Sequence, residues 1–295
     1  MARAWYGDTR RLIYSVVGLY RLETTRALRS KRPLLGFATL VTFLVLMLVG
    51  FYTYAEERTG GQADFRYTYE NRSYFNGLTF TVYAFYFGVI LILPVLAATE
   101  GGAQLAGDTG RGTLRLLVTR PVSRARIYLV KYAVGAATIV VLTGGLLGLS
   151  LMIGLFAVGW GDLDLYPGVL QMADEHQHLE QAVALERFFL AWPLASLALL
   201  TPFSFSLMIS SFSRNAVNAV GVAVALYLVL YVIAEVHFFE RLRPWLFTSE
   251  LAFWRGLFRE TIATDQLVRS AARLIGFNAA FCAAGLAWFR RREER

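Results

Sequence analysis

Residues 34–54 read Leu34-Leu-Gly-Phe-Ala-Thr-Leu-Val-Thr-Phe-Leu-Val-Leu-Met-Leu-Val-Gly-Phe-Tyr-Thr-Tyr54 and contain no charged side chain. A helix needs about 20 such residues to cross the hydrocarbon core of a bilayer. Five further segments are long and apolar enough for the same purpose: 78–99, 127–158, 188–212, 216–239 and 271–289. The sequence therefore predicts an all-α membrane protein with six transmembrane helices.

The composition of the whole chain supports this prediction. Apolar residues make up 56% of the 295 residues, and the charged residues lie in blocks between the apolar segments. A soluble domain of this size could not bury so much apolar surface and still cover its exterior with polar groups. No Gly-, Ser- or Pro-rich linker divides the chain, so we expect one transmembrane domain over residues 1–295.

The arginines indicate an orientation. Lys and Arg predominate before residue 34, in the connection 100–126 and after residue 289, whereas acidic residues predominate in 55–77 and 159–187. By the positive-inside rule, both termini and the connection 100–126 are expected in the cytoplasm, with the chain in the inner (cytoplasmic) membrane. The net charge of +8 does not indicate a nucleic-acid partner, because the arginines lie at the ends of apolar segments and suit lipid head groups.

Three segments outside the six spans also have interpretable patterns. Residues 10–32 combine apolar and arginine positions as an amphipathic helix at the cytoplasmic interface does, and Pro33 is expected to end that helix. Residues 169–186 are interpreted as an acidic external helix. Residues 241–269 mix tryptophan, phenylalanine and arginine, which predicts re-entrant or interfacial helices between spans five and six.

Sequence motifs for catalysis or ATP binding are absent. The chain contains no G-x-x-x-x-G-K-[ST], H-E-x-x-H or G-x-S-x-G pattern, so we expect no enzymatic activity and no bound cofactor. His176 and His178 lie among acidic residues, which leaves a weak external metal site conceivable. Residues at i and i+2 do not face each other in a helix, so a solvated acidic surface is preferred and no metal is expected.

The connection 100–126 carries the most informative pattern. Thr113 to Val118 forms an apolar run that is flanked by glycines, Gly110 and Gly112, and followed by a Pro-Val-Ser turn. A loop that only set the topology would not need this apolar run, since apolar side chains on a cytoplasmic element require a partner surface. We expect a short helix over 113–118, and Ser123 as the N-cap of the helix that follows it.

These residues resemble a known family. The Gly112-Thr113-Leu114-Arg115-Leu116-Leu117 run, Pro121-Val122-Ser123-Arg124 and Lys131-Tyr132 are similar to the signature loop of type 2 ABC exporter permeases. The subgroup that contains the nitrous oxide reductase maturation permease is the most similar. Residues 108–111 carry fewer charges than the family often has before this run.

The resemblance implies a membrane permease subunit, an exporter, driven by a separate ABC ATPase. It implies two ATPase copies that carry the ATP and Mg, and a second permease copy, as a homodimer or with a close paralogue. It also implies that the loop contains a coupling helix docked on the ATPase. The residues expected to couple this chain to the ATPase are Glu100, Gly112, Thr113, Leu114, Arg115, Leu117, Pro121, Ser123 and Arg124.

Two alternatives remain open: a membrane-embedded assembly factor and a secondary carrier, both working without an ATPase partner. The near absence of ionisable residues inside the spans argues against a carrier, which must bind its coupling ion there. The substrate is not evident in the sequence. Aromatic residues of spans one, two and five are candidates to line a substrate path, namely Phe43, Tyr83, Phe87 and Tyr227.

Overall fold

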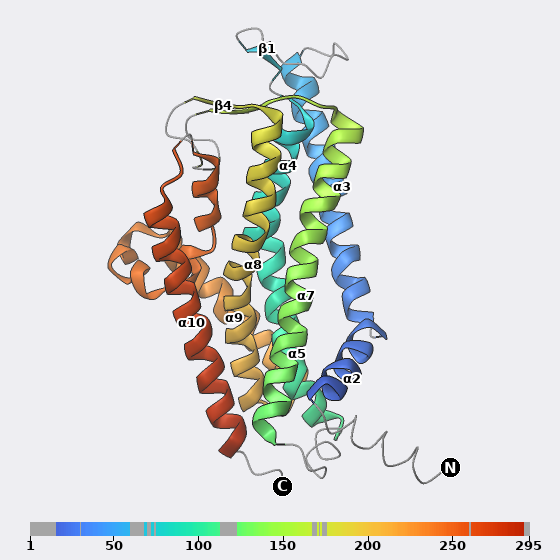
Figure 1. The fold of residues 1–295 in the computed structure, drawn as a ribbon, viewed down its shortest axis with the longest axis vertical. Coiled ribbons are helices and arrows are strands. Elements are labelled where there is room, and N and C mark those ends of the chain that lie inside the picture. The colour runs from blue at the N-terminus through green and yellow to red at the C-terminus, as the bar shows by residue number, and fades with distance from the viewer. Residues whose placement is uncertain are drawn as a thin grey trace.

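The computed structural model describes residues 16–29, 31–59, 68–69, 72–73, 75–112, 123–166, 170, 172, 176–259 and 261–291. Within this part of the chain, six helices are long and apolar enough to cross a membrane, which confirms the predicted all-α membrane fold. They form a bundle of roughly parallel and antiparallel helices (Figure 1). The six are α3 (Lys31–Thr59), α4 (Gly77–Phe87) continued by η1 (Gly88–Ile92) and α5 (Leu93–Gly110), α7 (Arg124–Ile153) continued by η2 (Gly154–Val158), α8 (Gln181–Phe212), α9 (Ala216–Glu235) and α10 (Thr264–Arg291).

Most helices extend beyond the spans expected from hydropathy. The connection predicted to begin at residue 100 begins only after Gly110, because the helical backbone of α5 continues through Glu100. The sixth helix begins at Thr264 rather than near 271, and the fifth ends at Glu235 rather than near 239. Hydropathy detects the part of a helix that lies in lipid, whereas the backbone hydrogen bonds continue into the polar turns beyond it.

A shorter helix, α2 (Val16–Arg29), occupies the place of the predicted amphipathic helix. It lies at the end of the bundle where α5 and α10 end and α7 begins (Figure 1); this end is called the α2 end below. Leu19 and Glu23 of α2 are buried, whereas Tyr20 and Leu22 are exposed. Pro33 does not lie in α2 but in the first turn of α3, where its missing N–H has no helical partner to lose.

The centre of the bundle is the second span, which packs along both α8 and α9. Gly101 permits the closest approach, because a Cβ added to it would lie 2.5 Å from the carbonyl oxygen of Phe203. Small residues are common where transmembrane helices approach closely, since lipid supplies no hydrophobic force between helices and packing must do so. The second span therefore forms one packed unit with α8 and α9.

The second span contains a π-helical turn, η1, immediately before Pro94. Proline has no N–H, so the carbonyl of Ile90, four residues earlier, has no α-helical donor. The hydroxyl of Tyr227 on α9 donates to this carbonyl at 2.9 Å. Tyr227 is 1% exposed, and its hydrogen bond fastens α9 to the irregular turn.

The end of the bundle opposite α2 carries two short hairpins, β1 (Thr68–Tyr69) with β2 (Arg72–Ser73) and β3 (Leu163–Leu165) with β4 (Gln177–Leu179), both antiparallel. The expectation of an acidic helix over 169–186 was wrong, because residues 177–179 pair with β3 and α8 begins at Gln181. The backbone N–H and C=O groups of β4 form their hydrogen bonds with β3. Helix propensity cannot predict this pairing, because it considers only residues close in sequence.

The strand also changes the relation between the two histidines. Side chains at i and i+2 share one face of an extended segment, and both His176 and His178 reach the buried Asp164. His178 Nδ1 lies 2.9 Å from Asp164 Oδ1, across the hairpin register. Within the described residues, no group of three His, Cys, Asp or Glu side chains is arranged to hold a metal ion. The histidines instead join the two strands.

Between α9 and α10 the chain forms three 3₁₀ segments, η3 (His237–Trp245), η4 (Phe247–Glu250) and η5 (Phe253–Phe258). These segments project from the side of the bundle rather than from its end (Figure 1). Trp254 and Phe258 are fully buried against the bundle, whereas Phe238 and Trp245 are exposed. The segments correspond to the re-entrant or interfacial helices predicted between spans five and six.

Candidate functional site

Polar side chains recur along one face of α5 near the α2 end. Glu100, Gln104 and Asp108 are spaced four residues apart, so they lie above one another on the helix. Gln104 Nε2 donates to Glu100 Oε1 at 3.2 Å. Asp108 is 5% exposed. A polar stripe therefore extends from the middle of α5 to its last turn, facing α2 and α7.

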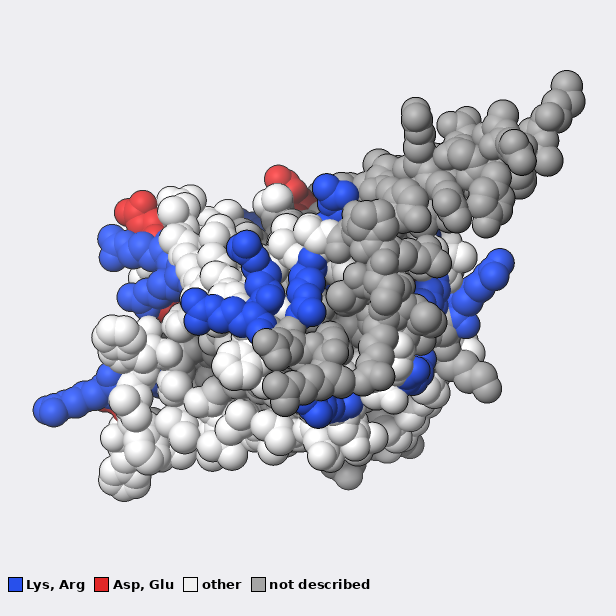
Figure 2. All heavy atoms as spheres, turned by 90° about the horizontal axis from the view of Figure 1, so that it is seen from below, with Lys and Arg blue, Asp and Glu red and all other residues white. Residues whose placement is uncertain are grey.

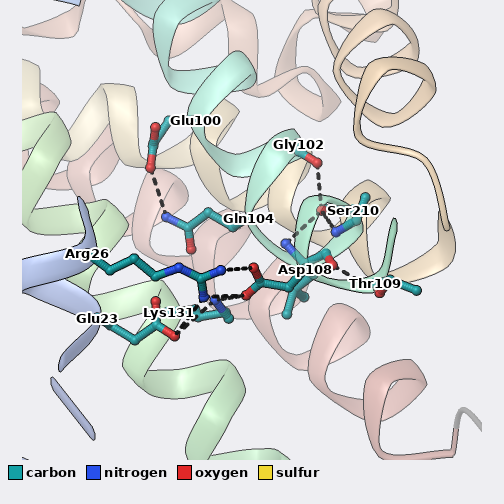
Figure 3. Close-up of polar contacts among 11 residues, drawn as sticks. Glu23, Arg26, Glu100, Gly102, Gln104, Asp108, Thr109, Lys131 and Ser210 are labelled. Carbon is teal, nitrogen blue, oxygen red and sulfur yellow. Dashed lines mark hydrogen bonds and ion pairs between the residues drawn. The ribbon is translucent and has the colours of Figure 1, made fainter. Parts of the chain in front are cut away.

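Four charged residues meet at the lower end of this stripe, and we call them the charge cluster: Glu23, Arg26, Asp108 and Lys131 (Figure 3). Lys131 Nζ lies 2.5 Å from Asp108 Oδ2 and 3.3 Å from Glu23 Oε1. Arg26 Nη2 lies 3.0 Å from Asp108 Oδ1, and Arg26 Nη1 lies 4.0 Å from Glu23 Oε1. Two acids and two bases thus form a closed, electrically balanced group.

The charge cluster is more buried than a surface salt bridge. The side chains of Lys131 and Asp108 are 5% and 6% exposed, and that of Glu23 is 10% exposed. Removing ions from water carries a penalty that close pairing only roughly offsets, but removing one partner leaves an uncompensated buried charge. That loss is about 3–5 kcal/mol. Arg26 is the most exposed of the four, at 37% of its side chain.

The charge cluster joins three elements that are distant in sequence. Glu23 and Arg26 come from α2, Asp108 from the last turn of α5, and Lys131 from the second turn of α7. Helices α5 and α7 are the two helices that lead into and out of residues 113–122. The charge cluster therefore links α2 to the two helices that flank this connection.

On its other side, α5 is attached to α8 by hydroxyl groups. Ser210 Oγ donates to the carbonyl of Gly102 at 2.7 Å and lies 3.1 and 2.9 Å from the amides of Leu105 and Ala106. Ser206 Oγ donates to the carbonyl of Ala98. We call this contact the α5–α8 seam; it consists of Ala98, Gly101, Gly102, Ser206 and Ser210. It couples the two helices through their backbones.

The structure positions both ends of the predicted coupling segment. Gly112 adopts a positive φ of 69°, a conformation that glycine tolerates and that ends α5. Ser123 is the N-cap of α7 and accepts a hydrogen bond from the Arg126 amide at 3.4 Å, as predicted. Arg124 reaches the carbonyl of Phe289 at the end of α10. Five of the predicted coupling residues lie outside the described part of the chain: Thr113, Leu114, Arg115, Leu117 and Pro121.

Glu100 lies apart from the other predicted coupling residues. It is ten residues before Gly110, or about 15 Å along the helix axis, and therefore not in the loop. Glu100 instead lines a cavity of about 230 Å³ together with Gln104, Asp108 and Lys131. Among the described residues, Glu100 is linked toward the loop through the polar stripe of α5.

The four aromatic residues proposed for a substrate path come from three different helices. Phe43 lies on α3, Tyr83 and Phe87 on α4, and Tyr227 on α9. Tyr227 is buried and hydrogen-bonded to the backbone of η1, and Phe43 packs partly buried against the core. Both side chains contribute to packing between helices in this chain, and a role of the four residues in a substrate path stays a prediction.

The charge cluster was not predicted from the sequence: Glu23 and Asp108, which pair with both Lys131 and Arg26, were not singled out. A signal for both acids exists. Glu23 is the only acidic residue in the basic stretch 10–32, and Asp108 is the only acidic residue between Glu100 and Arg126. A lone acid among arginines on a segment near the membrane indicates an internal ion pair, but the sequence does not identify the basic partner.

The fold is that of a polytopic α-helical membrane protein, and the charge cluster lies at one end of its helix bundle. The family described as ABC-2 family transporter protein matches residues 18–240. This match covers more than half of the chain, so the chain belongs to that family and is a membrane permease subunit of an ABC transporter. No curated protein matches the chain. The matched range includes all four residues of the charge cluster.

Proposed function

We propose that this chain is an exporter permease in which the charge cluster couples ATP hydrolysis on a partner to movement of the membrane helices. Two copies of an ABC ATPase bind ATP and Mg, and two permease copies enclose the substrate path. The observation that carries the proposal is the position of the charge cluster. It ties α2 to the two helices that flank residues 113–122.

The mechanism follows from the attachment of these helices. Leu114 and Leu117 dock in a groove of the ATPase, and closure of the two ATPases moves residues 113–122. Helix α5 passes this movement to α8 through the α5–α8 seam, and to α9 where Gly102 faces Val220. Helix α2 follows through its ion pairs with Asp108 and Lys131. Packed helices shift as rigid bodies in such transitions, so the substrate path opens alternately on the two sides.

Charge distribution supports placing the α2 end in the cytoplasm. Figure 2 shows this end from below, with Lys and Arg side chains spread over the visible face and few acidic ones. Exposed arginines at this end include Arg29, Arg111, Arg126, Arg214, Arg290 and Arg291. By the positive-inside rule, such a face remains on the cytoplasmic side of the inner membrane.

Leu114→Asp/Leu117→Asp tests the coupling role. Each well-packed leucine contributes about 2–5 kcal/mol to a buried contact, so the double variant is expected to release the ATPase or uncouple it. The measurement is co-purification of the ATPase and its hydrolysis rate in lipid. Leu114→Met/Leu117→Met is the matched control and retains the ATPase. Normal binding and substrate-stimulated hydrolysis in the aspartate variant would contradict the proposal.

Orientation is tested separately. In a Cys282→Ala background, a cysteine at position 115 is expected to react with a membrane-impermeant maleimide only after the cells are opened. Labelling of intact cells at that position would place the loop outside. Export is tested with inside-out vesicles, which should accumulate substrate only when ATP is supplied; accumulation driven by an ion gradient alone would indicate a secondary carrier.

As a further part of the proposal, this chain belongs to the subgroup that contains the nitrous oxide reductase maturation permease. The similarity of residues 112–124 to the signature loop supports this assignment. A neighbouring reading frame with Walker motifs and a maturation factor beside it would support this subgroup. The absence of a nitrous oxide reductase in the host would contradict it.

A further inference from the structure

A second polar cavity lies where α9, the 3₁₀ segments and α10 meet. Its volume is about 310 Å³. The charged and hydroxyl side chains that line it are Glu235, Arg243, Ser249, Glu250, Arg255 and Arg273. Nothing in the coupling mechanism uses these residues. Three arginines and two glutamates around one cavity beside a transmembrane span require an explanation, since charges near lipid are costly.

The three guanidinium groups are held in place by contacts with the protein. Arg243 Nε donates to the carbonyl of Ala234 at 2.8 Å, which satisfies the end of α9. Arg255 donates to the carbonyls of Ala252 and Leu170 and lies over the ring of Tyr86. Arg273 Nη1 lies 2.8 Å from Glu250 Oε1. A guanidinium has five N–H donors, so the contacts shown use only one donor of Arg243 and one of Arg273.

The two carboxylates of the cavity differ in their ion pairing. Glu250 pairs with Arg273, whereas Glu235 has no ion pair among the described residues. Glu235 is exposed at the last position of α9 and lines the same cavity as Arg243. The cavity therefore presents N–H donors held by contacts with the protein, together with a carboxylate that has no ion pair among the described residues. A ligand that carries both an anion and a cation complements this arrangement.

The depth of the cavity corresponds to lipid head groups. Helix α9 has 20 residues, about 30 Å, which equals the thickness of the hydrocarbon core, and Arg214 precedes it at the α2 end. Glu235 therefore lies at the head-group level of the leaflet opposite α2. Phe238, Trp245 and Val268 lie within about five residues of a cavity residue in the sequence and are 95%, 78% and 67% exposed. These apolar side chains provide a surface for acyl chains next to the charges.

We propose that this cavity binds the head group of a phospholipid that carries a phosphate and a primary amine, as phosphatidylethanolamine does. The phosphate oxygens accept hydrogen bonds from Arg243 and Arg273, since guanidinium forks match phosphate geometry. The ammonium pairs with Glu235. The acyl chains lie along Phe238 and Trp245. A lipid bound there holds the end of α9 against η3 and α10. The assignment does not depend on the coupling mechanism.

Native mass spectrometry of the full-length chain in detergent tests this site. The chain is titrated with phosphatidylethanolamine or phosphatidylglycerol of identical acyl chains, and the lipid-bound fraction is measured. Arg243→Gln is expected to weaken binding of both lipids about tenfold, the contribution of one charge-assisted hydrogen bond. Glu235→Gln is expected to remove the preference for phosphatidylethanolamine and to leave binding of phosphatidylglycerol unchanged.

Matched variants separate this site from general attraction to lipid. Arg269→Gln removes an exposed arginine of α10 outside the cavity and should leave the binding of both lipids unchanged. Arg243→Lys retains the charge without the planar fork, and an intermediate affinity is expected for it. All variants must retain the wild-type melting temperature to be compared. Equal weakening by Arg243→Gln and Arg269→Gln, or an unchanged lipid preference in Glu235→Gln, would overturn the proposal.

Two other possible occupants of the cavity, a soluble phosphate ester and a second subunit, would each give a different experimental result. Displacement of the lipid by soluble glycerophosphoethanolamine at a similar concentration would show a site for a free phosphate ester and would overturn the lipid assignment. Protection of a Ser249→Cys thiol from a water-soluble maleimide in delipidated protein, with Cys282 removed, would show that a second subunit covers the cavity. Labelling that is blocked only after phosphatidylethanolamine is added back is the result expected here.

Discussion

Helix α5 is held on its two sides by different kinds of contact. Toward α8, Gly101 faces backbone so closely that an added Cβ has no room, and the Ser210 hydroxyl bonds to the backbone of α5. Toward α2 and α7, the contact consists of the ion pairs of Asp108. The difference matters because repulsion between packed atoms rises steeply within a few tenths of an ångström. Ion pairs weaken gradually with distance, and the bases around Asp108 can exchange partners.

The comparison suggests which part of the protein moves. The α5–α8 seam keeps α5 and α8 in one geometry, so these helices act as a rigid block. The charge cluster permits a shift of α2 by an ångström or more without losing all its pairs, since each acid contacts two bases. We therefore expect α2 to move relative to the block during the transport cycle, and each prediction below tests one side of this comparison.

The largest loss of stability is expected from Lys131→Met. It leaves Asp108 and Glu23 buried with only the half-exposed Arg26 as a cation, which costs about 3–5 kcal/mol. Thermal unfolding in detergent, followed by tryptophan fluorescence, measures the loss. Asp108→Asn/Lys131→Met removes one acid and one base, and should be more stable than Lys131→Met alone. Additive losses in the double variant would show that the two charges do not interact.

Gly101→Val tests the seam. The new side chain meets the backbone of Phe203 and Leu207 rather than a movable side-chain end, so we expect a loss of about 3 kcal/mol. Gly221→Val on α9 is the control, because no atom lies within 4 Å of a Cβ at that position. Similar melting temperatures for the two variants would mean that α5 and α8 are less closely packed than described.

Ser210→Ala should have a smaller effect. The variant removes the hydroxyl that joins α8 to the Gly102 carbonyl, and a lost hydrogen bond of this kind costs about 0.5–1.5 kcal/mol. Thr39→Ala, which removes an exposed hydroxyl that bonds only within its own helix, should change the melting temperature very little. If the two alanine variants have the same melting temperature, Ser210 does not stabilise the α5–α8 seam.

Arg26→Gln is expected to change stability least. Its side chain is 37% exposed, and ion pairs that reach water contribute about 0–1 kcal/mol. The variant nevertheless removes the pair between α2 and α5, so substrate-stimulated ATP hydrolysis should fall while the melting temperature remains near that of the wild type. Arg29→Gln, an exposed neighbour on α2, should leave hydrolysis unchanged. Full coupling in Arg26→Gln would show that α2 does not take part.

Some parts of the molecule followed directly from local sequence. The apolar run 34–54 predicts a span because hydropathy is summed over neighbouring residues, and the helix that contains it is α3. Ser123 was identified as an N-cap because a cap hydrogen bond reaches only three residues along the chain. The turn at Gly112 is similarly local, since its positive φ concerns a single residue.

Other parts were misjudged or missed for a shared reason. The segment 169–186 was interpreted as a helix because its strand partner, β3, lies more than ten residues earlier in the sequence. The hydrogen bond of Tyr227 to the Ile90 carbonyl was not foreseen, because Pro94, which leaves that carbonyl unpaired, lies on another span. In both cases, a residue's role depends on an element that composition and periodicity cannot place beside it.

The sequence by itself determined six spans, the basic end of the bundle and the cap at Ser123, because hydrophobicity, charge and helix capping act over short stretches of chain. Only the tertiary structure decided that Asp108 meets Lys131 and Glu23, and that Gly101 faces the backbone of α8. Every helix in lipid has an apolar exterior, so hydropathy does not distinguish a face toward lipid from a face toward a neighbour. That distinction requires the packing of all six helices.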